Sequence, residues 1–378
     1  MKTSYSLKIS SLVLASILIA GLGFVSPALA GFRSFIVGPN SKMVTDIGSL
    51  GGIDAYGRGI NDAGQIVGWS RTPEGNTHAF ITGPKGEGMT DLGTLGGSDS
   101  WAYGINATGQ VVGRSLIAGD GSYHAFITGP NGNGMTDLGT LGGSNSWAYA
   151  INAAGQAAGV SLTTGDNSFR AFITGPGGAN MTDLGTLGGD YSAAHGINEA
   201  GRVVGDSFTS NGSQHAFITG PNGVDMADIN ALGGETFANG INSTGRTVGQ
   251  SDSHAFITGP NGAAMTDLGA LGGDESVAFG INDAGQVVGS AQVAGTPQSP
   301  QGDMHAFSTA PDGAGMSDLN LLVALPGGFL SEAHGINNSG LVVANGFVAS
   351  IPEPASYALM IAGLILLGFI VQGKKQLT

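Results

Sequence analysis

Histidine is the residue whose type and spacing first suggest chemistry, because it recurs before an Ala-Phe pair in five units of an internal repeat. The five are His78, His124, His215, His254 and His305, and arginine takes the same place at Arg33 and Arg170. A ring of imidazoles could bind a metal only if two or more side chains converged at about 2 Å from one ion. Positions a whole unit apart are too distant for this unless they line an axis. We therefore expect each histidine to hydrogen-bond a neighbouring loop.

Aspartate also recurs once per unit, and its carboxylate could bind a cation or bond the backbone. The aspartates are Asp46, Asp91, Asp137, Asp183, Asp228, Asp267 and Asp318. We expect them to make structural bonds within or between units rather than to act as general acids. Calcium is the alternative, since carboxylate oxygens and glycine turns suit this ion, although the nine-residue glycine–aspartate calcium repeat is absent. No other cofactor is predicted.

Asparagine follows isoleucine in every unit and precedes a turn that ends in glycine. The seven are Asn61, Asn106, Asn152, Asn198, Asn242, Asn282 and Asn337. An asparagine side chain in such a turn can bond the backbone two residues further on. The pattern therefore favours turn formation over contact with a sugar.

Catalysis finds little support in the remaining residues. No nucleophile–base set is recognisable, and Glu332 with His334 is the nearest to a polar pair that occurs in one unit only. The glycine-rich segments indicate β-turns rather than phosphate loops, because no helix is predicted after them. The absence of cysteine excludes thiol catalysis, disulfides and Cys-ligated zinc.

Large aromatic residues are concentrated in the first three units. They are Tyr56, Trp69, Trp101, Tyr103, Trp147 and Tyr149. Such side chains could stack on sugar rings, but packing between repeat units is the role that we favour.

The repeat itself predicts the elements that position these residues. The Ile-Asn pairs are separated by 45, 46, 46, 44, 40 and 55 residues, and each unit contains four short strand candidates bounded by glycine, proline and asparagine turns. Four strands in about 45 residues is the size of a β-propeller blade. We expect an all-β, seven-bladed propeller over residues 31–350, with an open β-solenoid as the alternative. Residues 346–349 resemble another first strand, which would pair with the N-terminal segment and close the ring.

The connections between units vary in length and mark a candidate interaction face. Between the Val-Val-Gly segment and the next His-Ala-Phe segment lie 9, 10, 10, 9, 4 and 15 residues. The longest loop, 291–304, contains Pro297 and Pro300 and would project farthest; the last unit has a second insertion at 321–330. Function on repeat scaffolds usually resides in such variable surface loops.

The charge of the body argues against nucleic acid as a partner. Residues 31–350 contain 9 basic and 26 acidic residues, a formal charge of −17. A phosphate backbone would be repelled by this surface.

Both ends of the chain read as targeting segments. Residues 1–30 have the pattern of a secretory signal, with Lys2 and Lys8 before an apolar stretch, and Ala28 and Ala30 before a predicted cleavage site at Gly31. An uncleaved anchor is the alternative. Residues 351–378 contain a 17-residue apolar run at 355–371, which is predicted to form a hydrophobic helix near the lower length limit of a membrane span.

Two resemblances follow from these residues. The body, from residue 32 to about 348, resembles the HAF family of extracellular repeats, named for its His-Ala-Phe triplet, for which no catalytic residues are implied. The tail resembles the PEP-CTERM sorting signal, with Pro352, Glu353 and Pro354 as its motif and Lys374 and Lys375 as its basic end. This resemblance implies recognition, and cleavage near the motif, by an exosortase-type enzyme. Gln372 and Gly373 stand where arginines are usual, and a plain single-span anchor is the alternative.

Together these patterns predict a non-enzymatic protein exported to the cell envelope or beyond, and anchored transiently or stably through residues 355–371. Its partners would be exopolysaccharide or surface proteins. The alternative is a propeller hydrolase or lyase acting on envelope polysaccharide, which would need paired carboxylates in an axial pocket.

Overall fold

The computed structural model describes residues 31–39, 44–119, 121–229, 233–296, 299–323, 325 and 327–348. The described residues belong to one compact unit, Gly31–Val348. The predicted signal segment, including Ala28 and Ala30, lies outside them. So do the apolar run 355–371, the motif Pro352–Pro354, and the pair Lys374 and Lys375. Gly31 is the first residue of the first strand.

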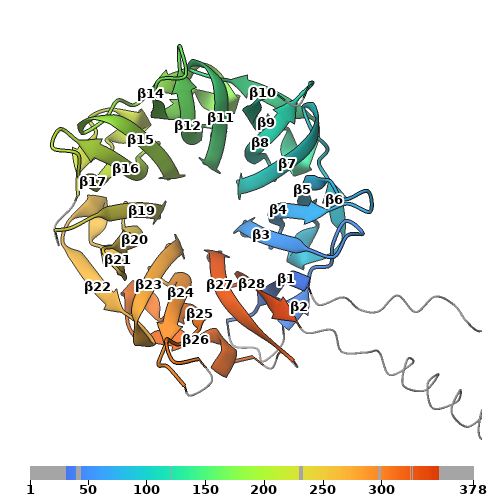
Figure 1. Ribbon diagram of the computed structural model, residues 1–378, viewed down its shortest axis with the longest axis vertical. Helices are drawn as coiled ribbons and strands as arrows, with labels where there is room; N and C mark the ends of the chain where they lie inside the picture. The colour runs from blue at the N-terminus through green and yellow to red at the C-terminus, as the bar shows by residue number, and fades with distance from the viewer. Residues whose placement is uncertain are drawn as a thin grey trace, which may run out of the picture. The chain divides into compact units, whose positions relative to one another are not determined.

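The unit is a β-propeller of seven four-stranded antiparallel sheets arranged around a central axis (Figure 1). The predicted architecture is confirmed, and the solenoid alternative is wrong. The innermost strands are β3 (Ala55–Ile60), β7 (Gly96–Ile105), β11 (Gly142–Ile151), β15 (Gly188–Ile197), β19 (Thr236–Ile241), β23 (Gly272–Ile281) and β27 (Gly328–Ile336). The second strands are β4 (Ile66–Arg71), β8 (Val111–Ile117), β12 (Ala157–Thr163), β16 (Val203–Thr209), β20 (Thr247–Ser251), β24 (Val287–Val293) and β28 (Val342–Val348).

The two outer layers contain the His-Ala-Phe segment and the short strand that follows it. The third strands are β5 (Thr77–Thr82), β9 (Tyr123–Thr128), β13 (Phe169–Thr174), β17 (Gln214–Ile218), β21 (His254–Thr258), β25 (Met304–Thr309) and β1 (Gly31–Val37). The outermost strands are β6 (Met89–Asp91), β10 (Met135–Gly139), β14 (Met181–Asp183), β18 (Ala227–Asp228), β22 (Met265–Gly269), β26 (Met316–Asp318) and β2 (Val44–Asp46). Blades are numbered 1 to 7 by their innermost strands, from β3 to β27.

Helical structure among the described residues is limited to short 3-10 turns. They are η1 (Pro84–Gly86), η2 (Pro130–Gly132), η3 (Pro176–Gly178), η4 (Pro221–Gly223), η5 (Pro260–Gly262), η6 (Pro311–Gly313) and η7 (Leu319–Leu321). No helix in this part of the chain has the length and apolarity needed to cross a membrane.

Blade 7 closes the ring with strands from both ends of the chain. Its order is β2-β1-β28-β27, and β1 pairs with β28 from Gly31 opposite Val348 to Val37 opposite Val342. The expected pairing of the two ends is therefore present. The expectation of a separate last strand at 346–349 is wrong, because Gly346–Val348 continues the strand that begins at Val342. With this pairing blade 7 has four strands like the other six blades, and it packs against blade 1 to complete the ring.

The core lies between neighbouring blades and is built from the repeated apolar positions. The phenylalanine of the third strand is buried in every blade: Phe35, Phe80, Phe126, Phe172, Phe217, Phe256 and Phe307. Phe172 of blade 3, for example, shares a cluster with Val112 and Ile127 of blade 2. Because each blade completes its neighbour's core, a blade on its own would expose this apolar surface to water.

Close contact between two strands explains the glycine of the Val-Val-Gly segment in blade 2. The innermost strand of blade 2 has a register irregularity between Ala102 and Gly104, opposite the second strand. A methyl group on Gly113 would lie 1.9 Å from the carbonyl oxygen of Trp101. Only glycine lets the two strands approach this closely.

The two faces of the propeller bear different connections. On one face, called here the asparagine face, the innermost strand turns into the second strand through residues such as 61–64. On the other, the hairpin face, the second strand turns into the third. The hydrogen bond from the Gly52 amide to the Arg71 carbonyl (3.0 Å) places the 72–76 hairpin beside the start of β3.

The longest predicted loop is shorter than expected. Ala291 lies within β24 and is fully buried, and Met304 is the first residue of β25. The connection between the two strands therefore spans residues 294–303. Pro297 lies outside the described residues.

Candidate functional site

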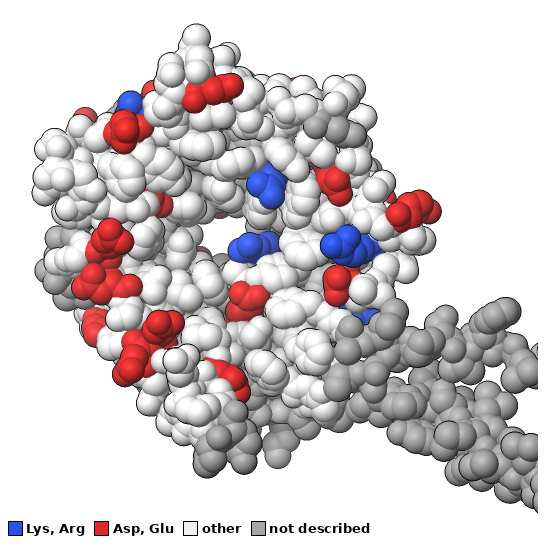
Figure 2. All heavy atoms as spheres, viewed as in Figure 1, with Lys and Arg blue, Asp and Glu red and all other residues white. Residues whose placement is uncertain are grey.

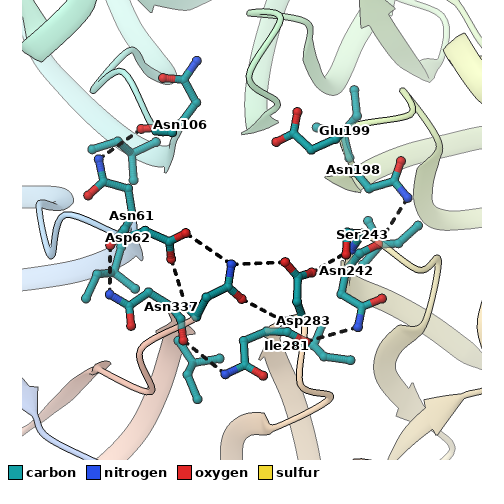
Figure 3. A pocket seen from close by; sticks show the side chains of 18 of the residues that line it. Asn61, Asp62, Asn106, Asn198, Glu199, Asn242, Ser243, Ile281, Asp283 and Asn337 are labelled. Carbon is teal, nitrogen blue, oxygen red and sulfur yellow. Dashed lines mark hydrogen bonds between the residues drawn. The ribbon is translucent and has the colours of Figure 1, made fainter.

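The seven asparagines form a closed ring of hydrogen bonds around the axis at the asparagine face. Each Nδ2 donates to the backbone carbonyl oxygen of the asparagine in the next blade at 3.0–3.2 Å, and Asn337 of blade 7 donates to Asn61 of blade 1. Figure 3 shows several of these side chains around the opening. Six of the seven asparagines, all but Asn152, line a cavity of about 230 Å³ together with the preceding isoleucines.

The same asparagines build the turns predicted for them. In all seven blades Oδ1 accepts the amide of the residue four positions on, at 2.9–3.0 Å. In four blades it also accepts the amide two positions on, as expected. The following glycine has a positive φ, +77° at Gly64, which glycine adopts without strain. The polar groups of the asparagines are therefore used within the fold. The residues that follow them at this opening differ between blades, as Asp62, Glu199 and Asp283 show (Figure 3).

The recurring histidines bond the recurring aspartates within one blade. Nδ1 of each His-Ala-Phe histidine lies 2.6–2.9 Å from Oδ2 of the aspartate on the adjoining outermost strand, as for His78 and Asp91. The other oxygen of five of the seven aspartates accepts a glycine amide two residues on, at 2.7–2.8 Å. The expected structural role is thus confirmed, although the histidine partner is a strand residue rather than a loop. Among the described residues no group of three or more histidine, aspartate or glutamate side chains converges as a metal site would require.

The other end of the axis differs from blade to blade. The residue two positions before the isoleucine is called here the axial ring, and it is Arg58, Tyr103, Tyr149, His195, Asn239, Phe279 and His334. Six of the seven line a second cavity of about 200 Å³, and all are half-buried. The isoleucines line both cavities and so separate this one from the asparagine ring. One backbone frame therefore presents seven side chains of five residue types at this mouth.

Variation continues outward over the hairpin face. Four positions before the isoleucine stand Tyr56, Trp101, Trp147, Ala193, Phe237, Val277 and Glu332. Their cross-strand partners on the second strand are Trp69, Arg114, Val160, Asp206, Gln250, Ser290 and Asn345. The residue types at these two positions therefore differ between blades, unlike the positions that the repeat keeps constant.

Aromatic stacks cover the hairpin face of blades 1 to 3. Tyr56 stacks between Phe32 and Trp69 with ring centroids 5.6 and 5.4 Å away and nearly parallel planes. Trp147 stacks on Phe169 at 5.2 Å in blade 3. All six predicted aromatic residues are half-buried, and several pack between blades as expected, such as Tyr103 of blade 2 on Tyr149 of blade 3, although they lie outside the fully buried core. Their rings lie in a surface layer next to the axial mouth.

The axial ring includes two tyrosines whose hydroxyls are shielded from water. Tyr103 and Tyr149 lie with ring centroids 5.2 Å apart, and Tyr149 contacts His195 at 5.4 Å. Burial raises the pKa of both hydroxyls above the ordinary value, although the charges of Arg114 and Arg58 oppose the rise. Both remain protonated at neutral pH and can donate a hydrogen bond.

Glu332 and His334 belong to a cluster at the seam between blades 7 and 1. Nε2 of His334 lies 3.0 Å from Glu332 Oε2 and 2.8 Å from the Tyr56 hydroxyl, and its Nδ1 lies 3.2 Å from Arg58 Nη1. The Tyr56 hydroxyl donates to the other oxygen of Glu332 at 2.5 Å. Burial, with the charge of Arg58, lowers the pKa of His334, whereas the pKa of Glu332 is lowered against burial by its bonds to His334 and Tyr56. Neutral His334 therefore has both ring nitrogens engaged.

His195 is the histidine of the axial ring with an unengaged nitrogen. Its Nε2 lies 2.6 Å from Oδ1 of Asp206. Asp206 is 2% exposed, and its other oxygen, Oδ2, accepts a hydrogen bond from the side-chain Nε2 of Gln214 at 2.6 Å. No hydrogen bond is found for Nδ1 of His195 in the described part of the chain, and its ring lines the cavity. The imidazole is therefore oriented by Asp206 and offers one nitrogen to a ligand.

Charge is unevenly distributed on the hairpin face. Figure 2 shows cationic side chains beside the central opening and over the neighbouring blades, and acidic side chains mainly over the blades across the opening. Blades 1 and 2 contribute Arg58, Arg71 and Arg114 to this face. Acidic side chains, such as Asp54 beside Arg71, lie among these cations, so this half is mixed in charge whereas the body as a whole is acidic.

Comparison with known proteins gives structural likenesses at low sequence identity. No model of a known protein family matches the chain, and no curated protein matches its sequence. Oligogalacturonate lyase from Vibrio parahaemolyticus superposes with a TM-score of 0.49 at 9% identity, covering 85% of this chain and 97% of that one. TolB from Acinetobacter baumannii gives 0.44 at 10% identity, over 74% of this chain and 63% of TolB. YCF48 bound to D1 peptide gives 0.44 at 13% identity, over 78% and 94%.

Sequence reasoning singled out some of the residues at the axial mouth and missed their arrangement. Glu332, His334 and the six aromatic residues were named, but not Arg58, Arg114, His195 or Asn239. The signal was present in the repeat. The segment Ala-x-Gly-Ile-Asn, with glycine in the alanine place in blade 1 and alanine in the glycine place in blade 3, keeps its length while x changes in nearly every unit. A variable position inside an invariant segment marks a side chain that the fold does not require.

Proposed function

We propose that the protein is a non-catalytic carbohydrate-binding propeller of the cell envelope, with its ligand site at the hairpin-face mouth of the axis. One observation supports this above the others: the axial ring differs from blade to blade on a frame that is otherwise repeated seven times. A purely structural ring would repeat as the asparagine ring does.

The chemistry of the mouth suits a sugar. Tyrosine hydroxyls, the Asn239 amide and the free nitrogen of His195 can exchange hydrogen bonds with hydroxyl groups. The aromatic rings of blades 1 to 3 offer flat apolar faces, on which the carbon–hydrogen faces of sugar rings can pack. A cavity of about 200 Å³ suits one sugar unit, and the stacks beside it could bind the units that follow.

Export and surface attachment form the second part of the proposal. They rest on residues 1–30 and on the motif Pro352, Glu353 and Pro354, with exosortase-type processing as the expected route. Substituting the three motif residues by alanine should leave the chain unprocessed and retained in the membrane fraction. An unchanged size and distribution would contradict this route.

Glycan binding tests the main proposal. The full-length protein, purified in a detergent without a sugar headgroup, is applied to an array that includes bacterial exopolysaccharides, and the ligands found are titrated calorimetrically. Tyr149→Ala should weaken binding at least tenfold, because the ring and hydroxyl line the cavity. Glu199→Ala on the asparagine face is the control and should change affinity less than twofold. Absence of any bound glycan, or equal losses in both variants, would contradict the proposal.

An envelope-polysaccharide hydrolase or lyase is the second candidate, and the His195–Asp206 pair is the observation that favours it. An aspartate that orients a histidine is a common general-base arrangement. The residues lining the hairpin-face cavity include no carboxylate pair, so a two-carboxylate glycosidase mechanism lacks its residues there. Release of reducing ends or unsaturated sugars from a bound polysaccharide, abolished by His195→Ala, would establish the enzyme and overturn the binding-only proposal.

A further inference from the structure

Arg114 is held in an aromatic enclosure at the boundary of blades 2 and 3. Its guanidinium carbon lies 4.6 Å from the ring centroid of Trp101, 5.0 Å from Tyr123 and 5.4 Å from Trp147. Trp101 and Tyr123 belong to the strands on either side of Arg114, and Trp147 belongs to the next blade. Three rings therefore surround one cation on the hairpin face.

Two buried donors of the enclosure have no acceptor. Nε of Arg114 and Nε1 of Trp147 are both buried and make no hydrogen bond. Among the ion pairs of the described residues, Arg71 pairs with Asp54 and Arg246 with Asp312, but Arg114 pairs with no carboxylate. An unsatisfied buried donor is destabilising, and an arginine cannot lose its proton to avoid the cost.

Cation–π contacts alone do not account for this arrangement. They attract the guanidinium to the ring faces, but they give no acceptor to the Nε–H group, which lies in the guanidinium plane. A planar guanidinium fork matches a carboxylate, which can accept two N–H bonds at once. The missing partner has the chemistry of an anionic oxygen acceptor.

We infer that Arg114, with Trp147 Nε1 beside it, binds the carboxylate of an acidic sugar, so that the ligand of this propeller is a uronic-acid-containing polysaccharide. This inference rests on the proposed carbohydrate-binding function and names its ligand class. Trp147 contributes its indole donor, because its ring already contacts Phe169 and Arg114, and the Trp101 ring packs against the sugar while the arginine bonds its carboxylate. The local cations of blades 1 and 2 favour an anion here, although the body as a whole is acidic.

A matched pair of ligands separates charge from sugar recognition. A β-1,4-linked tetraglucuronate and cellotetraose have the same backbone and differ in the carboxylates alone. Calorimetric titration of the full-length protein should give at least tenfold tighter binding of the tetraglucuronate. Arg114→Gln should remove most of that preference and leave cellotetraose binding within about twofold.

Three further variants exclude a merely structural effect. Arg71→Gln removes a cation of the same face that is already paired with Asp54, and should keep the preference. Arg114→Lys keeps the charge without the planar fork, and should bind with intermediate affinity. Trp147→Phe removes the indole donor but keeps a ring, and should lower affinity for the tetraglucuronate a few-fold. Thermal unfolding of each variant reports whether it folds.

The possible outcomes distinguish failure of the acidic-sugar inference from failure of the carbohydrate-binding proposal on which it rests. If both ligands bind equally well, or if Arg114→Gln weakens both alike, the acidic-sugar inference is overturned and the carbohydrate-binding proposal stands. If no glycan of any kind binds, both are overturned. Should Arg114→Gln fail to fold, Arg114→Lys and Trp147→Phe decide: an unchanged preference in both overturns the inference.

Discussion

The two ends of the propeller axis are built from the same seven innermost strands, and they differ in almost every other respect. At the asparagine face each strand ends in the same Ile-Asn pair, and each asparagine bonds the next blade. Toward the hairpin face, the residue two positions before each isoleucine differs from blade to blade. Only two residues lie between each axial-ring position, which varies, and the asparagine, which is the same in every blade.

The difference shows what the repeat is for. Ring closure needs seven equal contacts, because one missing bond leaves a gap between two blades. Ligand recognition needs unequal contacts, because a ligand that lacks sevenfold symmetry meets each blade differently. The asparagine ring satisfies the first requirement and leaves the hairpin face free to satisfy the second.

The largest expected effect comes from removing one member of the asparagine ring. Asn242 is 4% exposed, donates to the Asn282 carbonyl at 3.1 Å, and accepts the Arg246 amide at 3.0 Å. Asn242→Ala leaves these buried backbone groups without partners, so the free energy of unfolding should fall by about 2–4 kcal/mol. Urea denaturation of the full-length protein, followed by tryptophan fluorescence, measures the loss.

The same strand offers the matched control at the other end of the axis. Asn239, in the axial ring, is half-buried, and one side-chain bond is found for it, to the Ala278 carbonyl at 2.9 Å. Asn239→Ala should lower stability by less than about 1.5 kcal/mol. Equal losses for the two variants would show that both ends serve the fold, and would remove the contrast on which the proposed site depends.

A second prediction concerns the pH dependence of stability, which should originate in part at the hairpin face. Burial and the Arg58 charge lower the pKa of His334 below its ordinary value of 6.5, despite the nearby Glu332. As the pH falls below about 6.5, the unfolded chain binds a proton that the folded protein refuses. The free energy of unfolding should therefore decrease on acidification, by at most about 1.4 kcal/mol per pH unit from this group.

Substitution identifies the histidine responsible. Between pH 7 and pH 5, His334→Gln should show a shallower decrease in unfolding free energy than the unaltered protein. Asn239→Ala, at the same level of the axis, should retain the full slope. If His334→Gln keeps that slope too, the buried cluster with Tyr56 and Glu332 does not exclude the proton as described.

The smallest effect is expected from the repeated histidine–aspartate pairs, which lie on the outer strands of each blade. Burial would raise the pKa of Asp267, but its bonds with His254 and the Gly269 amide, and the His254 charge, hold it below the ordinary value of 3.8. The pair therefore stabilises the fold above that pH and loses this effect as the pH falls further. Because both side chains are more than a third exposed, His254→Ala should cost roughly 0.5 kcal/mol or less at pH 7.

A natural substitution in the chain supplies the comparison for that pair. Arginine takes the histidine's place at Arg170, so His254→Arg should retain most of the stability that His254→Ala loses. Measurement of both urea midpoints at pH 7 and pH 3 tests this. A loss above about 2 kcal/mol in His254→Ala would mean that the outer pairs contribute as much as the asparagine ring.

Much of the fold could be predicted from the sequence, because the same pattern of strands and turns recurs in seven units. Unit length and strand number predicted the blade, and the Ile-Asn turn predicted the asparagine bonding at Asn106 and its equivalents. The closing blade was predicted in its pairing but not in its strand boundaries. Gly346 had been assigned to a new strand, because Ala344 and Asn345 interrupt the glycine pattern that marks this strand elsewhere.

The candidate site followed less well, because its neighbours in space are far apart in sequence. Tyr56 and Glu332 lie 276 residues apart and meet only when the ring closes. Arg114 meets Trp147 only because blades 2 and 3 stand side by side. Such contacts depend on ring closure and on side-chain direction, which periodicity alone does not specify.

The closing blade has a mechanical consequence. Gly31 and Val348 are direct partners across β1 and β28, so the two ends of the ring lie at the same end of one strand pair. Tension applied between them would load the hydrogen bonds of this pair one after another instead of all together. We expect β1 and β28 to separate bond by bond from this end at low force. The chain contains no cysteine, so no disulfide opposes the separation.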